Sequence, residues 1–319
     1  MEDFWRVCTE SDFRSLALET FRFQARHLVP YRDYLSMIEC DVESVCEVEQ
    51  IPFLPIELFK SCKIYCNDTP PEAVFTSSGD VSSRHYMHSL ANYEEAFVRG
   101  FEHFYGDPAE WGVYALLPSY LEREGSSLIY MVDRLVARSE GRGGGFYLYD
   151  HQQLVEDMRR DSRPKILLGV SYALLDLAES GVVSEPLHNT IVMETGGMKG
   201  RREELSKREL HSRLCAAFGV ERIASEYGMA ELTSQGYSSG EGLFRTPPWM
   251  RVIIRDLADP FEVKRGGERG GVNIIDLASR YSCAFVETQD LGRVTSEGEF
   301  TIEGRISGSD IRGCNQLIE

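Results

Sequence analysis

The sequence predicts an α/β fold with largely parallel sheets flanked by helices, followed by a small antiparallel β subdomain. Short apolar segments that are typical of buried strands occur at residues 111–118, 165–170 and 190–193. Apolar residues at helical spacing, at 173–178 and 210–218, alternate with these segments. Such an alternation of strands and helices favours a parallel sheet.

The pattern changes after about residue 249, where short strand-like segments are separated by glycine-rich turns. This pattern indicates antiparallel pairing or a small barrel. The segments lie at 251–255, 272–275, 283–286 and 299–302. We therefore expect an α/β core over 1–248 and an antiparallel β subdomain over 249–319. Within the core, a helical segment covers about 1–70 and the sheet region covers about 71–248.

Local signals predict where the helices begin and end. Thr9 and Asp12 have the spacing of a capping box ahead of a helix over about 11–28. Aromatic residues at helical spacing predict a long helix over about 90–104. Gly219 directly follows the last helical segment, where a glycine can close a helix.

The composition restricts the partners that we expect. The formal net charge is −17, so the protein gains no electrostatic affinity for phosphate backbones or anionic lipids. We therefore expect no nucleic-acid partner. No apolar run approaches the roughly 18 residues of a membrane span, and we expect none.

The eight cysteines are scattered along the chain. The first residues, 1–5, lack the basic and apolar regions of a signal peptide. We therefore expect a cytoplasmic protein with free thiols, because disulfides are rare in reducing compartments.

A polar loop, Thr76-Ser77-Ser78-Gly79, follows a predicted strand at 74–75 and comes before the long helix. Hydroxyls, a glycine and exposed N–H groups at such a turn suit phosphate oxygens. The alternative is a plain turn that caps a helix. The loop is not a Walker loop, because no Gly-Lys-Ser/Thr follows it.

Two further motifs follow predicted strands. Gly196-Gly197 comes after the 190–193 strand, where paired glycines allow a close approach to the backbone; the alternative is a tight turn. Tyr227 and Glu231 lie where a strand from Val220 is expected to end, the edge at which open α/β sheets bind ligands. The alternative is a core tyrosine and a solvated glutamate.

Asp290 lies beyond the predicted 283–286 strand, and Gly304-Arg305 follows later. A carboxylate in such a place can accept hydrogen bonds from both ribose hydroxyls. The alternative is an ordinary turn that contains Asp.

The order of these motifs resembles the adenylate-forming superfamily of acyl-CoA synthetases and luciferases, from about residue 75 to 313. More narrowly, three segments resemble the LuxE-type acyl-protein synthetases of bacteria, which activate a fatty acid with ATP and pass the acyl group to a cysteine. These segments are 117–122, 193–201 and 309–315.

The resemblance implies the N-terminal large domain of the adenylate-forming fold, with ATP and Mg²⁺ as cofactors and a carboxylic acid, expected to be a fatty acid, as substrate. The residues implied for the ATP phosphates are Thr76, Ser77, Ser78, Gly79 and Arg84. Those implied for the adenine and acyl pocket are Gly196, Gly197, Tyr227 and Gly228. Asp290 and Arg305 are implied for ribose, and Glu231 for Mg²⁺.

The chain departs from the family pattern at several positions. Asp80 and Val81 replace two threonines of the phosphate loop, and Arg84 is the remaining source of positive charge there. Ala230 replaces the threonine that usually precedes the metal-binding glutamate, and Ser307 stands where the hinge acid is expected.

The resemblance also implies a thiol acceptor. Superfamily members usually carry a catalytic lysine in a further C-terminal domain, for which we find no counterpart, so a partner protein such as a reductase is implied for later steps. LuxE-type proteins carry a cysteine near their C-terminus, and Cys314 occupies that place. A thiolate there can attack a mixed anhydride, whereas the alternative is a small buried residue.

Three functions are therefore open from the sequence. The first is ATP-dependent acyl-adenylate formation with transfer of the acyl group to a thiol. The second is a non-catalytic protein that binds a nucleotide or an acyl group and retains the fold. The third is an acyltransferase that uses Cys314 with an activated donor and without ATP.

Overall fold

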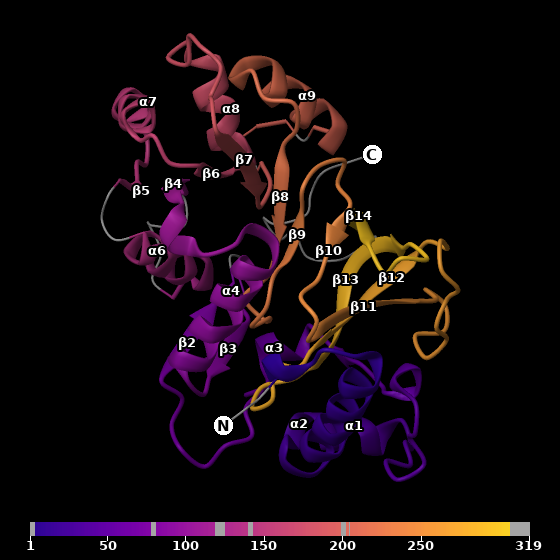
Figure 1. Cartoon of the computed structure of the whole chain (residues 1–319). Helices are drawn as coiled ribbons and strands as arrows, with labels where there is room; N and C mark the ends of the chain where they lie inside the picture. The colour runs from indigo at the N-terminus through magenta and orange to yellow at the C-terminus, as the bar shows by residue number, and fades with distance from the viewer. Residues whose placement is uncertain are drawn as a thin grey trace. The chain divides into compact units, whose positions relative to one another are not determined.

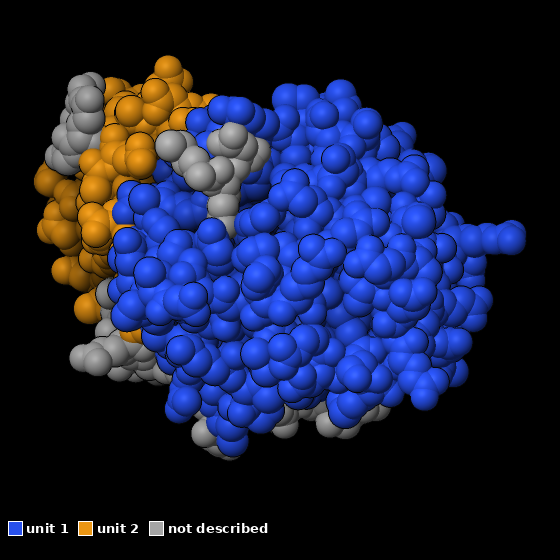
Figure 2. All heavy atoms as spheres, turned by 90° about the horizontal axis from the view of Figure 1, so that it is seen from below, with its two compact units in different colours: residues 1–99, 229–235, 245–309 blue, residues 100–228, 236–244, 310–319 orange. Residues whose placement is uncertain are grey.

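The computed structural model describes residues 4–77, 81–118, 125–139, 143–198, 202–203 and 205–306, and it confirms the predicted α/β class. The chain forms two compact units (Figure 2). Unit 1 comprises residues 1–99, 229–235 and 245–309, and unit 2 comprises 100–228, 236–244 and 310–319. The predicted division of the chain at residue 249 stays a prediction.

Unit 2 contains the predicted parallel sheet, in the strand order β5-β4-β6-β7-β8 with β9 antiparallel at the end (Figure 1). The strands are β4 (Gly112–Leu116), β5 (Gly144–Phe146), β6 (Lys165–Val170), β7 (Thr190–Thr195), β8 (Ala224–Tyr227) and β9 (Gly236–Ser238). Every residue of β4 and β6 is buried, as expected for strands inside a parallel sheet. Strand β8 begins at Ala224 rather than Val220, because the charged side chains of Glu221 and Arg222 are exposed.

The helices of unit 2 are α6 (Ser127–Arg138), α7 (His151–Arg160), α8 (Ser171–Glu179) and α9 (Lys207–Phe218). Helices α8 and α9 pack beside each other (Figure 1). As predicted, Gly219 closes α9: its φ of 64° is left-handed, and its N–H donates to the Cys215 carbonyl over 2.9 Å.

Unit 1 contains the predicted antiparallel strands in the order β11-β12-β13-β14. They are β11 (Met250–Arg255), β12 (Gly270–Asp276), β13 (Phe285–Val294) and β14 (Phe300–Arg305), and the short β1 (Leu54–Pro55) pairs in parallel with β13. Strand β13 is much longer than the predicted 283–286 segment. Asp290 therefore lies inside a strand, at a register irregularity, and the prediction that it lies beyond the strand is wrong.

Helix α1 (Glu10–His27) confirms the predicted N-terminal helix. The Thr9 hydroxyl accepts from the Asp12 N–H over 3.1 Å, and the Asp12 carboxylate accepts from the Thr9 N–H over 2.9 Å, which is the predicted capping box. The buried face of α1 packs on β13 through Phe21, whose ring lies edge-on to Phe285 at 6.1 Å. The other helical segments here are η1 (Phe4–Arg6), α2 (Val29–Met37), η2 (Val48–Gln50) and α3 (Leu58–Ser61).

The polar loop after residue 76 connects two strands, which corrects the prediction that a helix follows it. Strand β2 (Ala73–Thr76) pairs antiparallel with β3 (Arg84–Met87), and only then does α4 (Leu90–Tyr105) begin. Strand β3 alternates between outward and buried side chains, with Ser83 and His85 buried, so its period is that of a strand. The loop therefore closes a hairpin.

Two further short elements are η3 (Pro108–Glu110) and β10 (Phe244–Arg245). Over the described part of the chain, no helix combines the length and the apolar character that crossing a bilayer requires.

Candidate functional site

The end of the β2–β3 hairpin in unit 1 is closed by two serines. The Ser77 and Ser83 hydroxyl oxygens lie 2.6 Å apart, and the Ser83 N–H donates to the Ser77 hydroxyl oxygen over 2.9 Å. The Ser77 N–H in turn donates to the Ser83 carbonyl over 3.2 Å. Ser77 is half-buried and Ser83 is buried. The hairpin thus fixes one hydroxyl of the predicted phosphate loop, whereas Ser78 and Gly79 lie outside the described residues.

Glu231 reaches this hairpin end from a segment far away in the sequence. The Ser83 hydroxyl also contacts the Glu231 Oε1, across a sequence separation of 148 residues. The Glu231 side chain is fully buried, so the alternative of a solvated glutamate is wrong. The structure therefore brings together the predicted phosphate loop and the predicted Mg²⁺ ligand, joined by Ser83.

Ser83 and His85 are residues of this region that the sequence analysis missed. His85 is buried, and its Nδ1 lies 2.8 Å from the carbonyl oxygen of Ala230, next to Glu231. Burial lowers the pKa of His85, against the opposing effect of the Ala230 hydrogen bond. No local signal in the sequence marks either residue, because residues 83–87 do not alternate between polar and apolar side chains and the strand is defined by its pairing with β2.

The groups around Glu231 suit Mg²⁺ in their chemistry. Its carboxylate and the Ser77 and Ser83 hydroxyls are all oxygen donors, which a hard cation prefers. The described residues include no group of three or more His, Cys, Asp or Glu side chains arranged to hold a metal. A single carboxylate is nevertheless sufficient where the nucleotide phosphates supply further ligands.

Thr76 and Arg84 lie opposite each other at the last residue pair of the hairpin. Thr76 is half-buried and Arg84 is exposed. The hairpin therefore places one hydroxyl and one cation beside Ser77, which is the combination predicted for phosphate contact.

Asp290 and Arg305 are also brought together within unit 1, as cross-strand partners in β13 and β14. The Arg305 Nε lies 3.7 Å from the Asp290 Oδ1, and the Arg305 guanidinium donates to the Gln289 Oε1 over 2.7 Å. Asp290 is only 4% exposed. The two residues implied for ribose therefore form one ion pair, which holds both side chains in place.

In unit 2, Gly196 and Tyr227 lie at the carboxyl ends of the neighbouring strands β7 and β8. Gly196 has a φ of 67°, a left-handed conformation that favours glycine, and its carbonyl accepts from the Ser171 hydroxyl at 3.5 Å. Gly197 and Gly228 directly follow these two residues. The Tyr227 ring is buried and packs edge-on to Phe244 at 5.9 Å, which agrees with the alternative of a core tyrosine.

A buried cluster of polar side chains surrounds these strand ends. The Glu194 Oε1 accepts from the Lys207 ammonium at 2.8 Å and from the Ser225 hydroxyl at 2.5 Å. Burial disfavours the charged form of Glu194, but Lys207 and His211 outweigh it and lower the pKa of this carboxyl to about 2. Glu194 is therefore ionised throughout the neutral range.

The pKa of Glu226, on the adjacent strand, is shifted in the opposite direction. Burial raises the pKa of its carboxyl to about 7, and the negative charge on Glu194 contributes to this increase. The Thr195 hydroxyl, which donates to the Glu226 carboxylate over 2.5 Å, has the opposite effect and lowers the pKa. Among the described residues, cationic side chains lower the pKa of Glu194 and none is found to do so for Glu226, so these two buried carboxylates on neighbouring strands differ.

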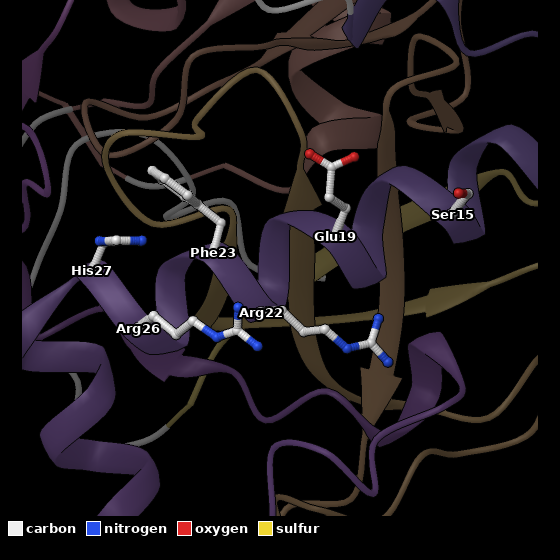
Figure 3. A pocket seen from close by; sticks show the side chains of 6 residues that line it. All are labelled: Ser15, Glu19, Arg22, Phe23, Arg26 and His27. Atoms are coloured by element: carbon white, nitrogen blue, oxygen red, sulfur yellow. The ribbon is translucent and has the colours of Figure 1, made fainter.

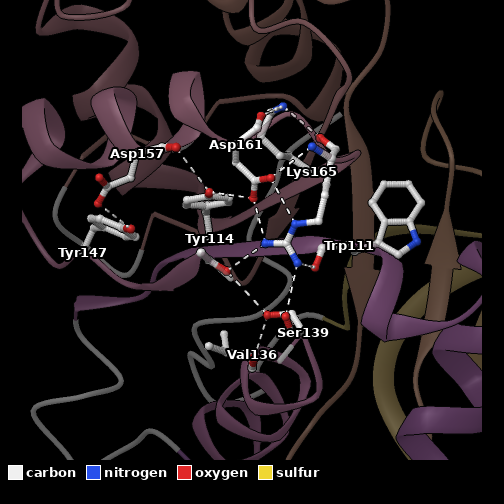
Figure 4. Close-up of polar contacts among 10 residues, drawn as sticks. Trp111, Tyr114, Val136, Ser139, Tyr147, Asp157, Asp161 and Lys165 are labelled. Atoms are coloured by element: carbon white, nitrogen blue, oxygen red, sulfur yellow. Dashed lines mark hydrogen bonds and ion pairs between the residues drawn. The ribbon is translucent and has the colours of Figure 1, made fainter. Parts of the chain in front are cut away.

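A second buried polar network of unit 2 joins β4 to the ends of α6 and α7 (Figure 4). The Arg163 guanidinium pairs with Asp161 at 2.8 Å and donates to the carbonyl oxygens of Trp111 and Ser139, both at 3.2 Å. The Tyr114 hydroxyl donates to the Asp161 Oδ2 over 3.0 Å. The network contains none of the predicted site residues, and we assign it to the packing of these elements.

A hollow on the surface of unit 1 is likewise distinct from the predicted site (Figure 3). Its lining side chains all come from α1: Ser15, Glu19, Arg22, Phe23, Arg26 and His27. A hollow with a lining from one helix lacks converging groups from several elements, which binding sites generally have.

The pKa values of Glu226 and Glu194 can be tested through the pH dependence of the protein's stability. Because the pKa of Glu226 rises on folding from its ordinary value of 4.5 to about 7, the wild-type protein loses about 3 kcal/mol of stability as the pH rises through this window. The Glu226→Gln variant should not show this loss. We would measure the free energy of unfolding in urea at pH 5 and pH 8.

The matched control is Glu194→Gln. The pKa of Glu194 falls on folding, so its stabilisation is present above pH 4.5 and is lost only as the pH falls towards 2. Its removal should therefore lower the stability at both pH 5 and pH 8. Most of the pH dependence should remain, reduced only by the part of the Glu226 shift that the Glu194 charge causes. Equal pH dependence of wild type and Glu226→Gln would contradict the assignment.

Comparisons of the sequence with known proteins identify no relative. No protein-family model matches the chain, and no curated protein sequence matches it. The cysteines among the described residues are free thiols, as expected, and Cys314 lies outside these residues.

Solved structures, in contrast, match the fold. A 2-hydroxyisobutyryl-CoA ligase in complex with 2-HIB-AMP and CoA has a TM-score of 0.67 at 14% identity, over 94% of this chain and 75% of that one. ATP-bound MatB from Rhodopseudomonas palustris has a TM-score of 0.55 at 15% identity, over 75% of this chain and 50% of that one. The O-succinylbenzoate coenzyme A synthetase MenE from Bacillus subtilis, in complex with ATP and magnesium ion, has a TM-score of 0.51 at 15% identity, over 75% of this chain and 52% of that one.

This chain thus spans about half the length of the MatB structures that it matches first. At these identities the similarity concerns the fold. The chain has the α/β fold of the adenylate-forming ligases.

Proposed function

We propose that this protein is an enzyme that forms an acyl-adenylate from a carboxylic acid and ATP, with Mg²⁺. The observation that carries this proposal is the buried contact between Ser83 and Glu231. It joins a hydroxyl-bearing hairpin to a carboxylate, in a fold shared with a ligase whose structure contains an acyl-AMP.

In this function the residues of the hairpin contact the ATP phosphates. Ser77, held by Ser83, supplies a fixed hydroxyl, and Arg84 supplies a positive charge. Thr76, Ser78 and Gly79 complete the set implied by the family resemblance. Glu231 holds Mg²⁺, which neutralises phosphate charge when it is bound. This local arrangement counteracts the net charge of −17, which disfavours the binding of an anion.

The rest of the nucleotide is assigned by the same resemblance. Asp290 accepts hydrogen bonds from the ribose hydroxyls, and Arg305 orients it through their ion pair. The glycines after β7 and the end of β8 line the adenine and acyl pocket: Gly196, Gly197, Tyr227 and Gly228. A carboxylate oxygen of the substrate then attacks the α-phosphorus, the bond from this phosphorus to the bridging oxygen breaks, and pyrophosphate leaves. Alignment and charge neutralisation are sufficient for this step.

We further propose an acyl-protein synthetase of the LuxE type, with a fatty acid as substrate and Cys314 as acceptor. The Cys314 thiol loses its proton to solvent, the thiolate attacks the acyl carbon of the adenylate, a thioester forms, and AMP leaves with the bonding electron pair. This assignment rests on the sequence resemblance around residues 309–315.

A second candidate is a protein that binds a nucleotide or an acyl group without catalysis. The buried Tyr227 ring favours it, because a buried ring offers no free face for stacking on a base. Ala230 and Asp80 favour it as well, since one lacks a phosphate-binding hydroxyl and the other repels phosphate.

The Glu231→Gln variant tests adenylate formation. The amide keeps the size of the side chain and removes the charge that holds Mg²⁺, so the rate of acid-dependent ATP–pyrophosphate exchange should fall by at least about tenfold. The Mg²⁺ concentration for half-maximal exchange should rise. The exposed Glu262→Gln is the control and should behave as wild type. An absence of exchange in the wild-type protein, with any acid of a broad panel, would favour the non-catalytic candidate.

The Asp290→Asn variant tests the ribose assignment. Hydrogen bonds to a charged acceptor contribute about 1.5–3 kcal/mol, so kcat/KM for ATP should fall by roughly tenfold or more. For 2′-deoxy-ATP, which lacks one hydroxyl, the decrease should be smaller. The exposed Asp68→Asn serves as the control. An equal decrease for both nucleotides would show that Asp290 does not contact the 2′-hydroxyl.

The Cys314→Ser variant separates adenylation from acyl transfer. After incubation with ATP, Mg²⁺ and tetradecanoic acid, mass spectrometry should locate an acyl thioester on Cys314 in the wild type and none in the variant. Pyrophosphate exchange should be unchanged. Cys8→Ser, at an exposed thiol, is the control. A thioester that forms from acyl-CoA without ATP would instead identify an ATP-independent acyltransferase.

A further inference from the structure

Asp276 is a fully buried carboxylate at the end of β12 in unit 1, and none of the predicted functions includes it. Its Oδ2 accepts from the backbone N–H groups of Thr233 and Ser234, both at 2.8 Å. Its Oδ1 accepts from the Ser234 hydroxyl at 2.7 Å and from the Ala278 N–H at 3.2 Å. The Ser279 hydroxyl adds a contact to Oδ2 at 3.3 Å.

These donors satisfy the carboxylate from within the protein. A buried charge is costly unless several hydrogen bonds compensate it. Since both oxygens of Asp276 already accept from at least two donors each, the side chain is suited to fixing backbone positions rather than to holding a ligand.

The backbone that Asp276 fixes is the segment that carries Glu231. Thr233 and Ser234 follow Glu231 by two and three residues. The segment has two further supports, since Trp249 donates to the Ser234 hydroxyl over 2.9 Å and the hydroxyls of Thr233 and Ser279 lie 2.8 Å apart.

On the other side of Glu231, His85 contacts the Ala230 carbonyl at 2.8 Å. The segment is thus held immediately before Glu231 by the hairpin strand β3 and shortly after it by the end of β12. These contacts restrict the backbone conformation at Glu231 and therefore the position of its carboxylate.

We propose that Asp276 is a positioning residue for Mg²⁺ binding, because it fixes Glu231 against the Ser77–Ser83 end of the hairpin. This inference rests on the proposed function, since it assigns a role towards the metal that Glu231 holds. A purely structural role of Asp276 would affect stability alone, whereas a positioning role also affects the affinity for the metal.

The test measures binding rather than turnover. We would titrate Mn²⁺, as a spectroscopic substitute for Mg²⁺, into the full chain with a non-hydrolysable ATP analogue and follow free Mn²⁺ by electron paramagnetic resonance. The Asp276→Asn variant loses the charge and at least one hydrogen bond, so the Kd for Mn²⁺ should rise by about tenfold. Ser234→Ala keeps the Asp276 charge and removes the 2.7 Å contact with Asp276 and the 2.9 Å contact with Trp249, so it should raise the Kd less. If Asp276→Asn does not fold, Ser234→Ala alone tests the positioning role.

The matched control is Asp161→Asn, the same substitution at a buried carboxylate of the Arg163 network in unit 2 (Figure 4). It should lower the temperature of unfolding and leave the Kd for Mn²⁺ unchanged. In a Glu231→Gln background, Asp276→Asn should cause no further increase in the Kd, because the ligand that it positions is absent.

The outcomes separate this inference from the proposed function. Nucleotide-dependent Mn²⁺ binding in the wild type that neither Asp276→Asn nor Ser234→Ala weakens would overturn the positioning role alone. A wild-type protein that binds no Mn²⁺ with the nucleotide analogue would overturn the proposed function, and this inference with it. An equal increase in the Kd for Asp161→Asn would show a general effect of destabilisation and would also overturn the positioning role.

Discussion

The buried carboxylate of Glu231 is the constraint on which the arrangement of unit 1 depends. A charge that is removed from water needs hydrogen-bond donors or a cation. Ser83 supplies a donor, and Ser83 can do so only because the β2–β3 hairpin brings it to Glu231. The pairing of two short strands therefore determines where a carboxylate and the hydroxyl of Ser77 meet.

The same physical requirement is met differently in unit 2. Glu194 is compensated by the Lys207 ammonium and remains charged, whereas burial raises the pKa of Glu226 to about 7. Both carboxylates accept from hydroxyls, so hydroxyls alone do not determine the charge state. The charge state of these two carboxylates therefore follows from burial and from the charges near each of them.

The sequence was sufficient to predict elements with strong local signals. The segment 165–170 is a strand with the predicted ends, because the apolar run that follows Lys165 is typical of a strand that is buried on both faces. Thr9 and Gly219 mark helix ends through hydrogen bonds with residues close in sequence. The class of the fold follows from the alternation of such elements.

The parts that the sequence analysis missed depend on distant contacts. The strand β3 is only four residues long and is defined by its pairing with β2, so no periodicity of its own revealed it. The contact between Ser83 and Glu231 spans 148 residues, and family motifs predicted Glu231 but not its partner. Asp276 directly follows an apolar run at the end of a strand. This position in the sequence indicates a role for Asp276 only when the antiparallel register of β11 and β12 is known.

Residues 229–235, which include Glu231, have a glycine on each side, and hydrogen bonds to other segments hold their backbone. Residues 229–235 belong to unit 1, whereas Gly228 and Gly236, which flank them, belong to unit 2. A glycine on each side leaves the backbone more freedom than any other residue would, and ordering it has an entropic cost. The hydrogen bonds from Asp276 and His85 offset this cost inside unit 1. The position of Glu231 therefore depends on the backbone contacts of Asp276 and His85 as well as on the contact of Ser83 with its carboxylate, and a sequence motif centred on Tyr227 and Glu231 describes only part of the site.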